Sequence, residues 1–354
     1  MKICVYAISR NEEKFVKRWV KSMSEADKIF VLDTGSTDNT VKLLKENGVI
    51  VREEIINPWR FDVARNKSLD MVDSDTDVCV CTDLDEEFVE GWRKKLEDNY
   101  KKGYRVNYTY NWHINNKGIP DVTFYLNNIH PKKDYYWVHP VHEVLTCKKE
   151  EKVISIMDII LNHYPDIKKN RSNYLTLLEL SVKEDPLDDR NMHYLGREYM
   201  YYERYEDCIN TLKKHLNLKS STWNLERSAS MRFIARSYFN LKNVEEAEFW
   251  YKKAIKEAPN LRDGYVELGI LYYNQKQWLD SIFYLIQALM INKKELVYMN
   301  EIFSWDNTIY DVLSIDYYNI GLYLESLFYI NKALEFDNNN KRLLDNKKII
   351  ELLV

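Results

Sequence analysis

The segment DVCVCTDLDEE, residues 77–87, joins an apolar strand to a cluster of acidic side chains. Val78 to Cys81 form an unbroken apolar run, which is typical of a parallel strand covered on both faces. Asp83 and Asp85 follow this strand, and ligands bind at the carboxyl ends of strands in open α/β sheets. Because side chains alternate along an extended chain, both carboxylates can face one divalent cation. The alternative is a solvated turn whose acids begin the next helix.

Runs typical of strands alternate with amphipathic segments over residues 1–164. The expected strands are KICVYAIS, KIFVLDTG, VIVREEI and DVCVCTD, and the expected helices include NEEKFVKRWVKSM, NTVKLLKENG and DVARNKSLDMV. This βαβα order predicts an α/β domain with a mostly parallel sheet and helices on both of its faces.

A helical repeat with successive spacings of 39, 34 and 45 replaces the strand pattern after about residue 188. Five columns share these spacings: Gly196, Ala235, Gly269 and Ser314; Tyr199, Tyr238, Tyr272 and Tyr317; Tyr205, Val244, Trp278 and Tyr323; Cys208, Ala247, Ser281 and Ser326; Leu216, Ile255, Leu289 and Leu334. The shortest of these spacings is the period of tetratricopeptide repeats, in which small residues allow paired helices to approach closely. We therefore expect an all-α solenoid in which the column residues pack between repeats, with insertions at 220–225 and 293–306.

Composition excludes several classes of protein. The formal charge of -4 gives no global attraction to nucleic acid or to an anionic membrane. The amino terminus resembles no signal peptide, and the chain contains no run of about 18 apolar residues, so we expect a soluble, cytoplasmic protein. Five cysteines without a Cys-x-x-Cys pair suggest reduced core residues and neither a disulfide framework nor a structural zinc site.

Four segments at the ends of successive strands, residues 8–16, 31–40, 59–70 and 81–88, together resemble the nucleotide-sugar domain of glycosyltransferase family 2, which has the GT-A fold. The repeats that follow are similar to the tail of two-domain members that glycosylate peptides or proteins, including the S-glycosyltransferases of glycosylated bacteriocins. The resemblance implies a GT-A domain at 1–165, a helical connector at 166–187 and a tetratricopeptide domain at 188–354.

The resemblance also implies a site for a nucleotide sugar. Asp33 precedes a tight turn and can accept a hydrogen bond from the imide N–H of a uracil ring. Arg65 and Arg60 lie in the third segment, where a guanidinium can bind phosphate or pair with Asp62. For Arg60 and Asp62 the alternative is an internal ion pair that holds the loop. The implied nucleotide-sugar contacts are Asn11, Glu12, Asp33, Asp62, Arg65, Asp83, Leu84 and Trp137.

A bound Mg²⁺ or Mn²⁺ would neutralise the leaving diphosphate. By resemblance to the family, Asp85 binds the metal, Asp83 contacts ribose or metal, and His163 either completes the metal site or is structural. The segment WVHPVHEVL, residues 137–145, supplies Glu143 as the expected catalytic base, with Trp137 able to stack on a sugar or on the acceptor. The alternatives are that Glu143 only anchors other residues of the site, or that His142 is the base or a metal ligand.

These observations predict a metal-dependent, inverting glycosyltransferase that moves a hexosyl or N-acetylhexosaminyl group from a UDP-sugar to a peptide or protein side chain. We expect the repeats to recruit the acceptor and to be able to form a homodimer. One alternative is an acceptor that is a surface glycan or glycolipid. Another is a non-catalytic tetratricopeptide scaffold with a decayed GT-A domain, against which the intact Asp33, Asp83, Asp85 and Glu143 argue.

Overall fold

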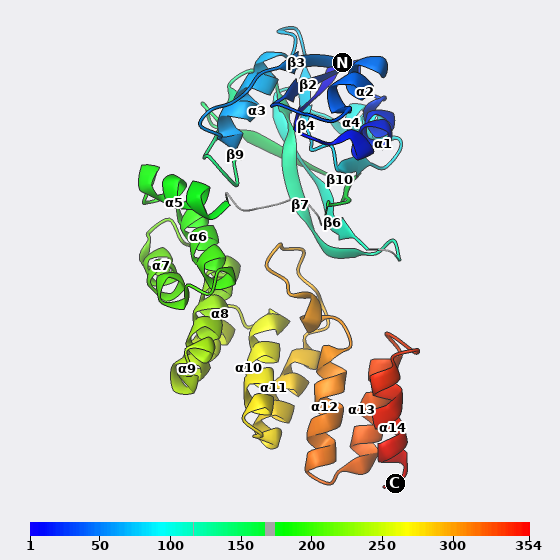
Figure 1. The fold of residues 1–354 in the computed structure, drawn as a ribbon, viewed down its shortest axis with the longest axis vertical. Helices are drawn as coiled ribbons and strands as arrows, with labels where there is room; N and C mark the ends of the chain where they lie inside the picture. Colours follow the sequence, from blue (N-terminus) through cyan, green and yellow to red (C-terminus); the bar gives the residue numbers. More distant parts are fainter. Residues whose placement is uncertain (116, 167–173) are drawn as a thin grey trace. The chain divides into compact units, whose positions relative to one another are not determined.

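The computed structural model describes residues 1–115, 117–166 and 174–354. The chain forms two compact units, which Figure 1 shows as ribbons. The first unit comprises Met1–Glu184 with Leu296–Tyr298, and the second comprises Asp185–Glu295 with Met299–Val354. The connector expected at 166–187 lies partly outside the described residues. Its described part contains helix α5, Tyr174–Glu184, which groups with the first unit.

An eight-stranded, mostly parallel sheet with the order β3-β2-β1-β4-β7-β6-β10-β5 forms the centre of the first unit. Its strands are β1 (Ile3–Ser9), β2 (Lys28–Asp33), β3 (Ile50–Glu53), β4 (Val78–Cys81), β5 (Glu86–Phe88), β6 (Tyr104–Ile114), β7 (Pro120–Pro131) and β10 (Lys152–His163). Strands β1 to β4 pair in parallel, which confirms the four predicted strands. A separate antiparallel ribbon joins β8 (Tyr135–Val138) to β9 (Val144–Cys147).

Apolar side chains cover both faces of this sheet, as the run in β4 predicts. Val78 and Val80 pack in the cluster that includes helices α1, α2 and α4, whereas Cys79 and Cys81 pack on the opposite face with α3 and the β8-β9 ribbon (Figure 1). The helices are α1 (Glu13–Met23), α2 (Thr40–Glu46), α3 (Phe61–Asp70) and α4 (Trp92–Asn99). Burying a large apolar side chain stabilises the fold by roughly 1.5–3 kcal/mol, so this alternation fixes which helix lies on which face.

The antiparallel pair β6 and β7 was not predicted. In β6, the buried Val106, Tyr108 and Tyr110 alternate with half-buried Asn107 and Thr109, a period of two that the sequence does contain. Strand β10 then runs beside β6, and its end pairs with β5. This return brings the carboxyl end of β10 next to the acidic turn that follows β4.

The second unit consists of paired helices, which confirms the predicted repeat. The helices are α6 (Asp189–Tyr201), α7 (Tyr205–Asn217), α8 (Asn224–Asn240), α9 (Val244–Glu257), α10 (Arg262–Asn274), α11 (Trp278–Met290), α12 (Thr308–Asn319), α13 (Tyr323–Leu334) and α14 (Lys341–Glu351), with a short 3-10 helix, η1 (Ile302–Ser304). The third predicted column supplies the first residue of α7, α9, α11 and α13. A methyl group on Gly269 would lie 2.7 Å from the side chain of Leu285, so the small-residue column is required for packing.

The turn inside each repeat contains a left-handed residue at one fixed position. Glu203, Lys242, Lys276 and Gly321 have φ angles of 60°, 64°, 59° and 79°. Their successive spacings, 39, 34 and 45, are the same as those of the predicted columns. Only the fourth repeat has the glycine that this conformation favours.

A back-folded segment, residues 299–304, lies between α11 and α12 and contacts α8 and α10. The Arg232 guanidinium on α8 donates to the Met299 carbonyl at 2.9 Å, and Arg236 pairs with Glu301 at 2.5 Å. On α10, one oxygen of Asp263 accepts from the Glu301 amide at 2.7 Å and from a serine hydroxyl of η1 at 3.0 Å. The insertion predicted at 293–306 therefore includes a segment tied to helices of two earlier repeats. None of the helices in the described ranges has the length and apolar character needed to cross a bilayer.

Candidate active site

Asp33, at the carboxyl end of β2, organises the turn that follows it. Its carboxylate accepts hydrogen bonds from the Ser9 hydroxyl at 2.8 Å, from the Gly35 and Ser36 amides at 3.0 and 2.8 Å, and from the Ser36 hydroxyl at 2.5 Å. A carboxylate has about four acceptor positions, so these local groups fill them. A uracil imide could bind Asp33 only by replacing one of these donors.

The loops after β1 and β2 are joined to each other. The side-chain oxygen of Asn11 accepts from the Thr37 backbone amide at 2.7 Å, and the backbone amide of Asn11 donates to the Ser36 hydroxyl at 2.8 Å. Glu12 is buried, and its amide donates to the Thr40 hydroxyl at 2.7 Å. Two of the predicted contacts therefore shape the edge of the site, with Asn11 the more exposed of the two.

Arg65 on α3 bridges the acidic turn and the segment that carries the predicted base. Its guanidinium lies 2.6 Å from Asp83 and 3.0 Å from Glu143, and its side chain is 8% exposed. Burial by itself lowers the pKa of Arg65, but the carboxylates of Asp83 and Glu143 outweigh burial and raise it well above its ordinary value. Three predicted site residues thus form one ion-paired group, and the phosphate-binding role of Arg65 would require one of these carboxylates to move.

Trp137 has a different role from the one predicted. Its side chain is 4% exposed, and its indole N–H donates to the Tyr6 hydroxyl at 2.9 Å. The side-chain amide of Asn66 on α3 pairs with both the amide and the carbonyl of Trp137, each at 2.8 Å. Trp137 therefore anchors β8 to the core, and little of its ring is available to stack on a sugar. Leu84 is also a core residue, with 2% exposure, so its side chain is not a ligand contact in this conformation.

His163 lies beside Asp85 because β5 and β10 pair at this point. Glu86 faces His163 in the strand register, and the Tyr164 amide donates to the Asp85 carbonyl at 2.8 Å. The His163 Nε2 atom is 3.5 Å from the Asp85 carboxylate, and each side chain is 12% exposed. Burial lowers the pKa of His163, but Asp85 more than compensates and raises it. The structure brings these two predicted metal ligands together.

Glu86 is a site residue that sequence analysis did not single out. Its carboxylate accepts from the Asp83 amide and from the Tyr110 hydroxyl, both at 2.8 Å. Burial, followed by the charge of Asp83, raises the pKa of Glu86 to about 8. Glu86 therefore fixes the backbone of the acidic turn through its hydrogen bond from the Asp83 amide. Its position in DLDEE was visible, but the strand pairing that buries it was not.

The donor set at the acidic turn suits a hard divalent cation only in part. Asp85 and His163 offer oxygen and nitrogen ligands, whereas Asp83 is 47% exposed and paired with Arg65. Within the described ranges, the one group of three ligand atoms all within 4.8 Å of one another is elsewhere, at Asp189, His215 and Glu226 of the second unit. The ring nitrogens of His215 there contact two serine hydroxyls at 3.0 Å each, as in a buried polar network.

The pair Arg60 and Asp62 forms the internal ion pair that was one of the two predicted alternatives. Two guanidinium nitrogens of Arg60 lie 3.0 and 2.9 Å from the two oxygens of Asp62. The same guanidinium binds Glu184 of α5 at 2.6 Å, and these bonds to Asp62 and Glu184 raise the pKa of Arg60. Asp62 is 8% exposed and also accepts a hydrogen bond from the Val63 backbone amide at 2.9 Å, in the first turn of α3.

The segment between β8 and β9 carries the predicted base in a strained turn. His139 and His142 have φ angles of 77° and 49°, in the left-handed region. The Phe61 amide at the start of α3 donates to the Pro140 carbonyl at 3.0 Å. The Arg65 guanidinium forms an ion pair with Glu143 at the end of this turn. Helix α3 therefore binds the segment at Pro140 and at Glu143.

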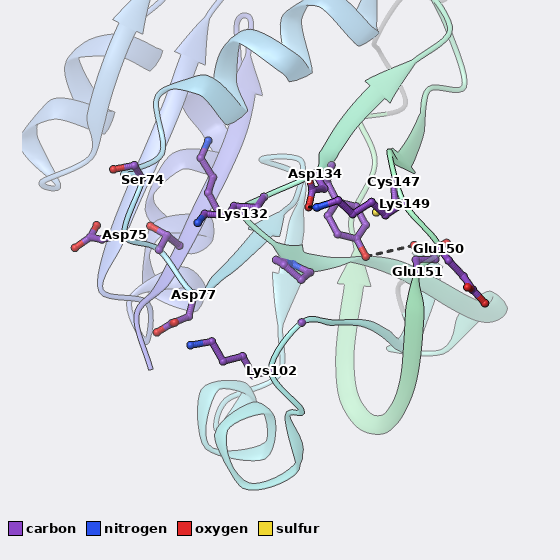
Figure 2. Close-up of a pocket in the computed structure, with 15 residues that line it drawn as sticks. Ser74, Asp75, Asp77, Lys102, Lys132, Asp134, Cys147, Lys149, Glu150 and Glu151 are labelled. Atoms are coloured by element: carbon purple, nitrogen blue, oxygen red, sulfur yellow. Dashed lines mark hydrogen bonds and ion pairs between the residues drawn. The ribbon is translucent and has the colours of Figure 1, made fainter.

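A hollow of about 470 Å³ lies at the end of the strands opposite to the acidic turn (Figure 2). Its lining includes Asp77, which precedes β4, and Lys132, which follows β7. Both lysines and acids line it, among them Lys102, Asp134 and Lys149. None of the predicted site residues lines this hollow, so it is separate from the acidic turn.

The mostly parallel sheet defines the first unit as a GT-A-like α/β domain, and the helix pairs define the second as a tetratricopeptide solenoid. Residues 4–143 match the family model described as glycosyl transferase family 2, which supports glycosyltransferase activity in general. No curated protein compared with the chain matches it.

The solved structures that are similar to this chain include two described as tetratricopeptide proteins, TTC0263 and YrrB. TTC0263 from Thermus thermophilus is 20% identical, with 51% of this chain and 90% of that chain covered and a TM-score of 0.37. MamA is 21% identical, with 51% of this chain and 99% of that chain covered and a TM-score of 0.39. YrrB, described as a protein with an unusual peptide-binding site, is 12% identical, with 50% and 83% covered and a TM-score of 0.38.

Proposed function

We propose that the protein is a metal-dependent, inverting glycosyltransferase that uses a UDP-sugar and modifies a side chain of a peptide or protein. The observation that carries this proposal is the ion-paired group in which Arg65 joins Asp83 of the acidic turn to Glu143. The family match over residues 4–143 supports the same class of activity. In this proposal, Asp83 lies on the donor side and Glu143 on the acceptor side of the reaction, and Arg65 holds both.

Asp85 and His163 would hold a divalent cation, with Asp83 joining them or binding the ribose. The cation, Mg²⁺ or Mn²⁺, supplies Lewis-acid neutralisation of the leaving diphosphate when bound. The acceptor heteroatom attacks the anomeric carbon as the bond from that carbon to the diphosphate oxygen breaks. Glu143 takes the proton that the acceptor loses. One of its oxygens binds Arg65, and the other receives no hydrogen bond from the described residues.

The second unit would recruit the acceptor and could also support a homodimer, as the sequence analysis predicts. Stacked helix pairs offer an extended binding surface. Size-exclusion chromatography with light scattering over a range of concentrations tests the homodimer separately from catalysis.

The test of the catalytic proposal is a screen of nucleotide sugars for hydrolysis and for thermal stabilisation, with Mn²⁺ and with excess chelator. A ligand that binds only the native state raises the melting temperature. We expect a UDP-sugar to give both signals, and Asp85→Asn to abolish the metal-dependent part while the fold remains intact. Asp98→Asn on α4, whose side chain is 55% exposed, is the matched control and should behave as wild type. Full activity of Asp85→Asn, or of the wild type in chelator, would exclude the metal role.

A further inference from the structure

Two arginines occupy the same position in the first and second repeats. Arg197 on α6 and Arg236 on α8 are separated by the first of the three repeat spacings. Each lies over an aromatic ring that also keeps this spacing: Arg197 is 4.6 Å from the centre of the Tyr194 ring, and Arg236 is 5.0 Å from that of Phe233. Cation–π contacts of this kind orient a guanidinium and leave its edge available for a carboxylate.

In the second repeat, this arginine binds two carboxylates. Arg236 contacts Glu267 of the next repeat at 2.7 Å and Glu301 of the back-folded segment at 2.5 Å. One helical turn earlier, Arg232 binds the Met299 carbonyl of the same segment at 2.9 Å. The chain thus places a short segment of its own, with a single glutamate, across α8 and α10, and an arginine binds each of two groups in it, a backbone carbonyl and the glutamate carboxylate.

In the first repeat, neither carboxylate has a counterpart among the described residues. The position equivalent to Glu267 one repeat earlier is Phe233, so the neighbouring repeat offers a ring in place of an acid. No carboxylate of the described residues lies within ion-pair distance of Arg197, and its buried Nε atom has no hydrogen-bond partner among them. A guanidinium with a buried, unbonded N–H is costly, and an anionic ligand would remove that cost.

Further aromatic rings lie near Arg197. The Phe233 ring lies 5.9 Å from the His193 ring and 6.3 Å from the Tyr201 ring, and Tyr201 is 58% exposed. Burial lowers the pKa of His193 to about 3, so this imidazole is neutral and does not compete as a cation. Arg197 therefore presents its charge in a largely aromatic setting.

We propose that Arg197 binds the carboxylate of an Asp or Glu residue in an extended peptide segment that crosses α6 and α8, as Arg236 binds Glu301. The proposal deepens the recruitment of a peptide acceptor proposed above, since it specifies an acidic side chain and the repeat that binds it. A carboxylate suits this place because both oxygens can pair with the guanidinium fork.

The test measures binding of a fluorescein-labelled peptide copied from residues 297–304 to the full-length protein, beside the same peptide with its glutamate replaced by glutamine. We expect the wild type to bind the glutamate peptide about tenfold more tightly, as a charge-assisted hydrogen bond warrants. Arg197→Ala should remove this preference. Arg197→Lys keeps the charge without the guanidinium fork, so it should retain part of the preference for the glutamate peptide. This variant takes the place of Arg197→Ala if the alanine variant does not fold.

Arg204→Ala is the matched control, because Arg204 also lies over a tyrosine ring, at 4.3 Å, but already pairs with Asp207 at 2.7 Å. It should bind both peptides as the wild type does. Equal affinity of the wild type for the two peptides would overturn the proposal, and so would a preference that survives in Arg197→Ala. No nucleotide sugar is present in this assay, so the result does not depend on whether any donor is hydrolysed.

Discussion

Acid should destabilise the first unit through one fully buried imidazole, His130 on β7. Its Nε2 atom lies 2.8 Å from the Tyr6 hydroxyl and its Nδ1 atom 2.8 Å from the Pro131 carbonyl. Because a carbonyl only accepts, Nδ1 carries the proton and Nε2 accepts from Tyr6. Tyr6 in turn accepts from the indole of Trp137. With a neutral ring, every hydrogen bond in this series from Trp137 to Pro131 has a donor and an acceptor. A second proton, on Nε2, would point at the Tyr6 hydroxyl, which now donates to that atom.

The magnitude follows from the change in pKa on folding. Burial, aided by the charges of Arg105 and Lys132, lowers the pKa of His130 from 6.5 to about 3. Below pH 6.5 the imidazole of His130 binds a proton in the unfolded chain but not in the folded chain. The free energy of unfolding that is present above this pH is therefore lost as the pH falls toward 3. The loss is about 1.4 kcal/mol per pH unit and reaches roughly 5 kcal/mol at its limit.

The assay compares wild type with His130→Gln, which cannot titrate, in urea titrations at several pH values from about 7.5 to about 4.5. Pulsed hydrogen exchange at one fixed pH, read on peptides from β4 and β7, follows the first unit alone. The stability difference between the two proteins should shrink by about 1.4 kcal/mol per unit below about pH 6. His193→Gln in the second unit is the control, because it should leave the values for the first unit unchanged. A constant difference across this range would show that His130 is not held neutral.

Three further predictions concern the ion-paired group and the repeat turns. Arg65→Met should lower the free energy of unfolding by about 3 kcal/mol in urea titrations, because it leaves the 13%-exposed Glu143 carboxylate without its partner, and a loss below about 0.5 kcal/mol would contradict the burial argument. Glu143→Gln should slow sugar transfer roughly 10²–10⁴-fold while calorimetry finds donor affinity nearly unchanged; weakened donor binding with normal turnover would instead assign Glu143 to the donor side. Gly321→Ala should lower stability by about 1 kcal/mol, whereas Lys276→Gly, at the same left-handed position one repeat earlier, should not lower it. If thermal unfolding gave both variants a melting temperature on the same side of the wild-type value, the explanation from the left-handed backbone conformation would be refuted.

The sheet and the repeats were predictable because their patterns are local and repeated. In β4, four apolar residues in succession indicate burial on both faces, and the clusters confirm that alternate residues pack on opposite sides. The repeat columns were identified by spacing alone, and the third column coincides with the first residue of each second helix. Such signals depend on neighbours a few residues away or on repetition along the chain.

The geometry of the site was less predictable because it depends on pairing between distant segments. His163 reaches Asp85 through β5, a short strand that carries no recognisable pattern. In β8 the sequence YYWV is apolar throughout, so nothing distinguished the buried Trp137 from the more exposed Tyr136. The two partners of Arg65 come from segments 18 and 78 residues away in sequence, and composition does not reveal that one guanidinium binds both.

The back-folded segment also determines how the solenoid can come apart. In an ordinary repeat array each unit contacts only its neighbours, so terminal units can be removed or can fray one at a time. Here Met299 and Glu301, which follow the third repeat, satisfy arginines of the second. A chain cut after α11 would remove the Met299 carbonyl from the buried Arg232 on α8, so the damage would appear beyond the helix pair α10–α11 that adjoins the cut. Repeats two and three, both of which bind this segment, should therefore melt as a single cooperative block.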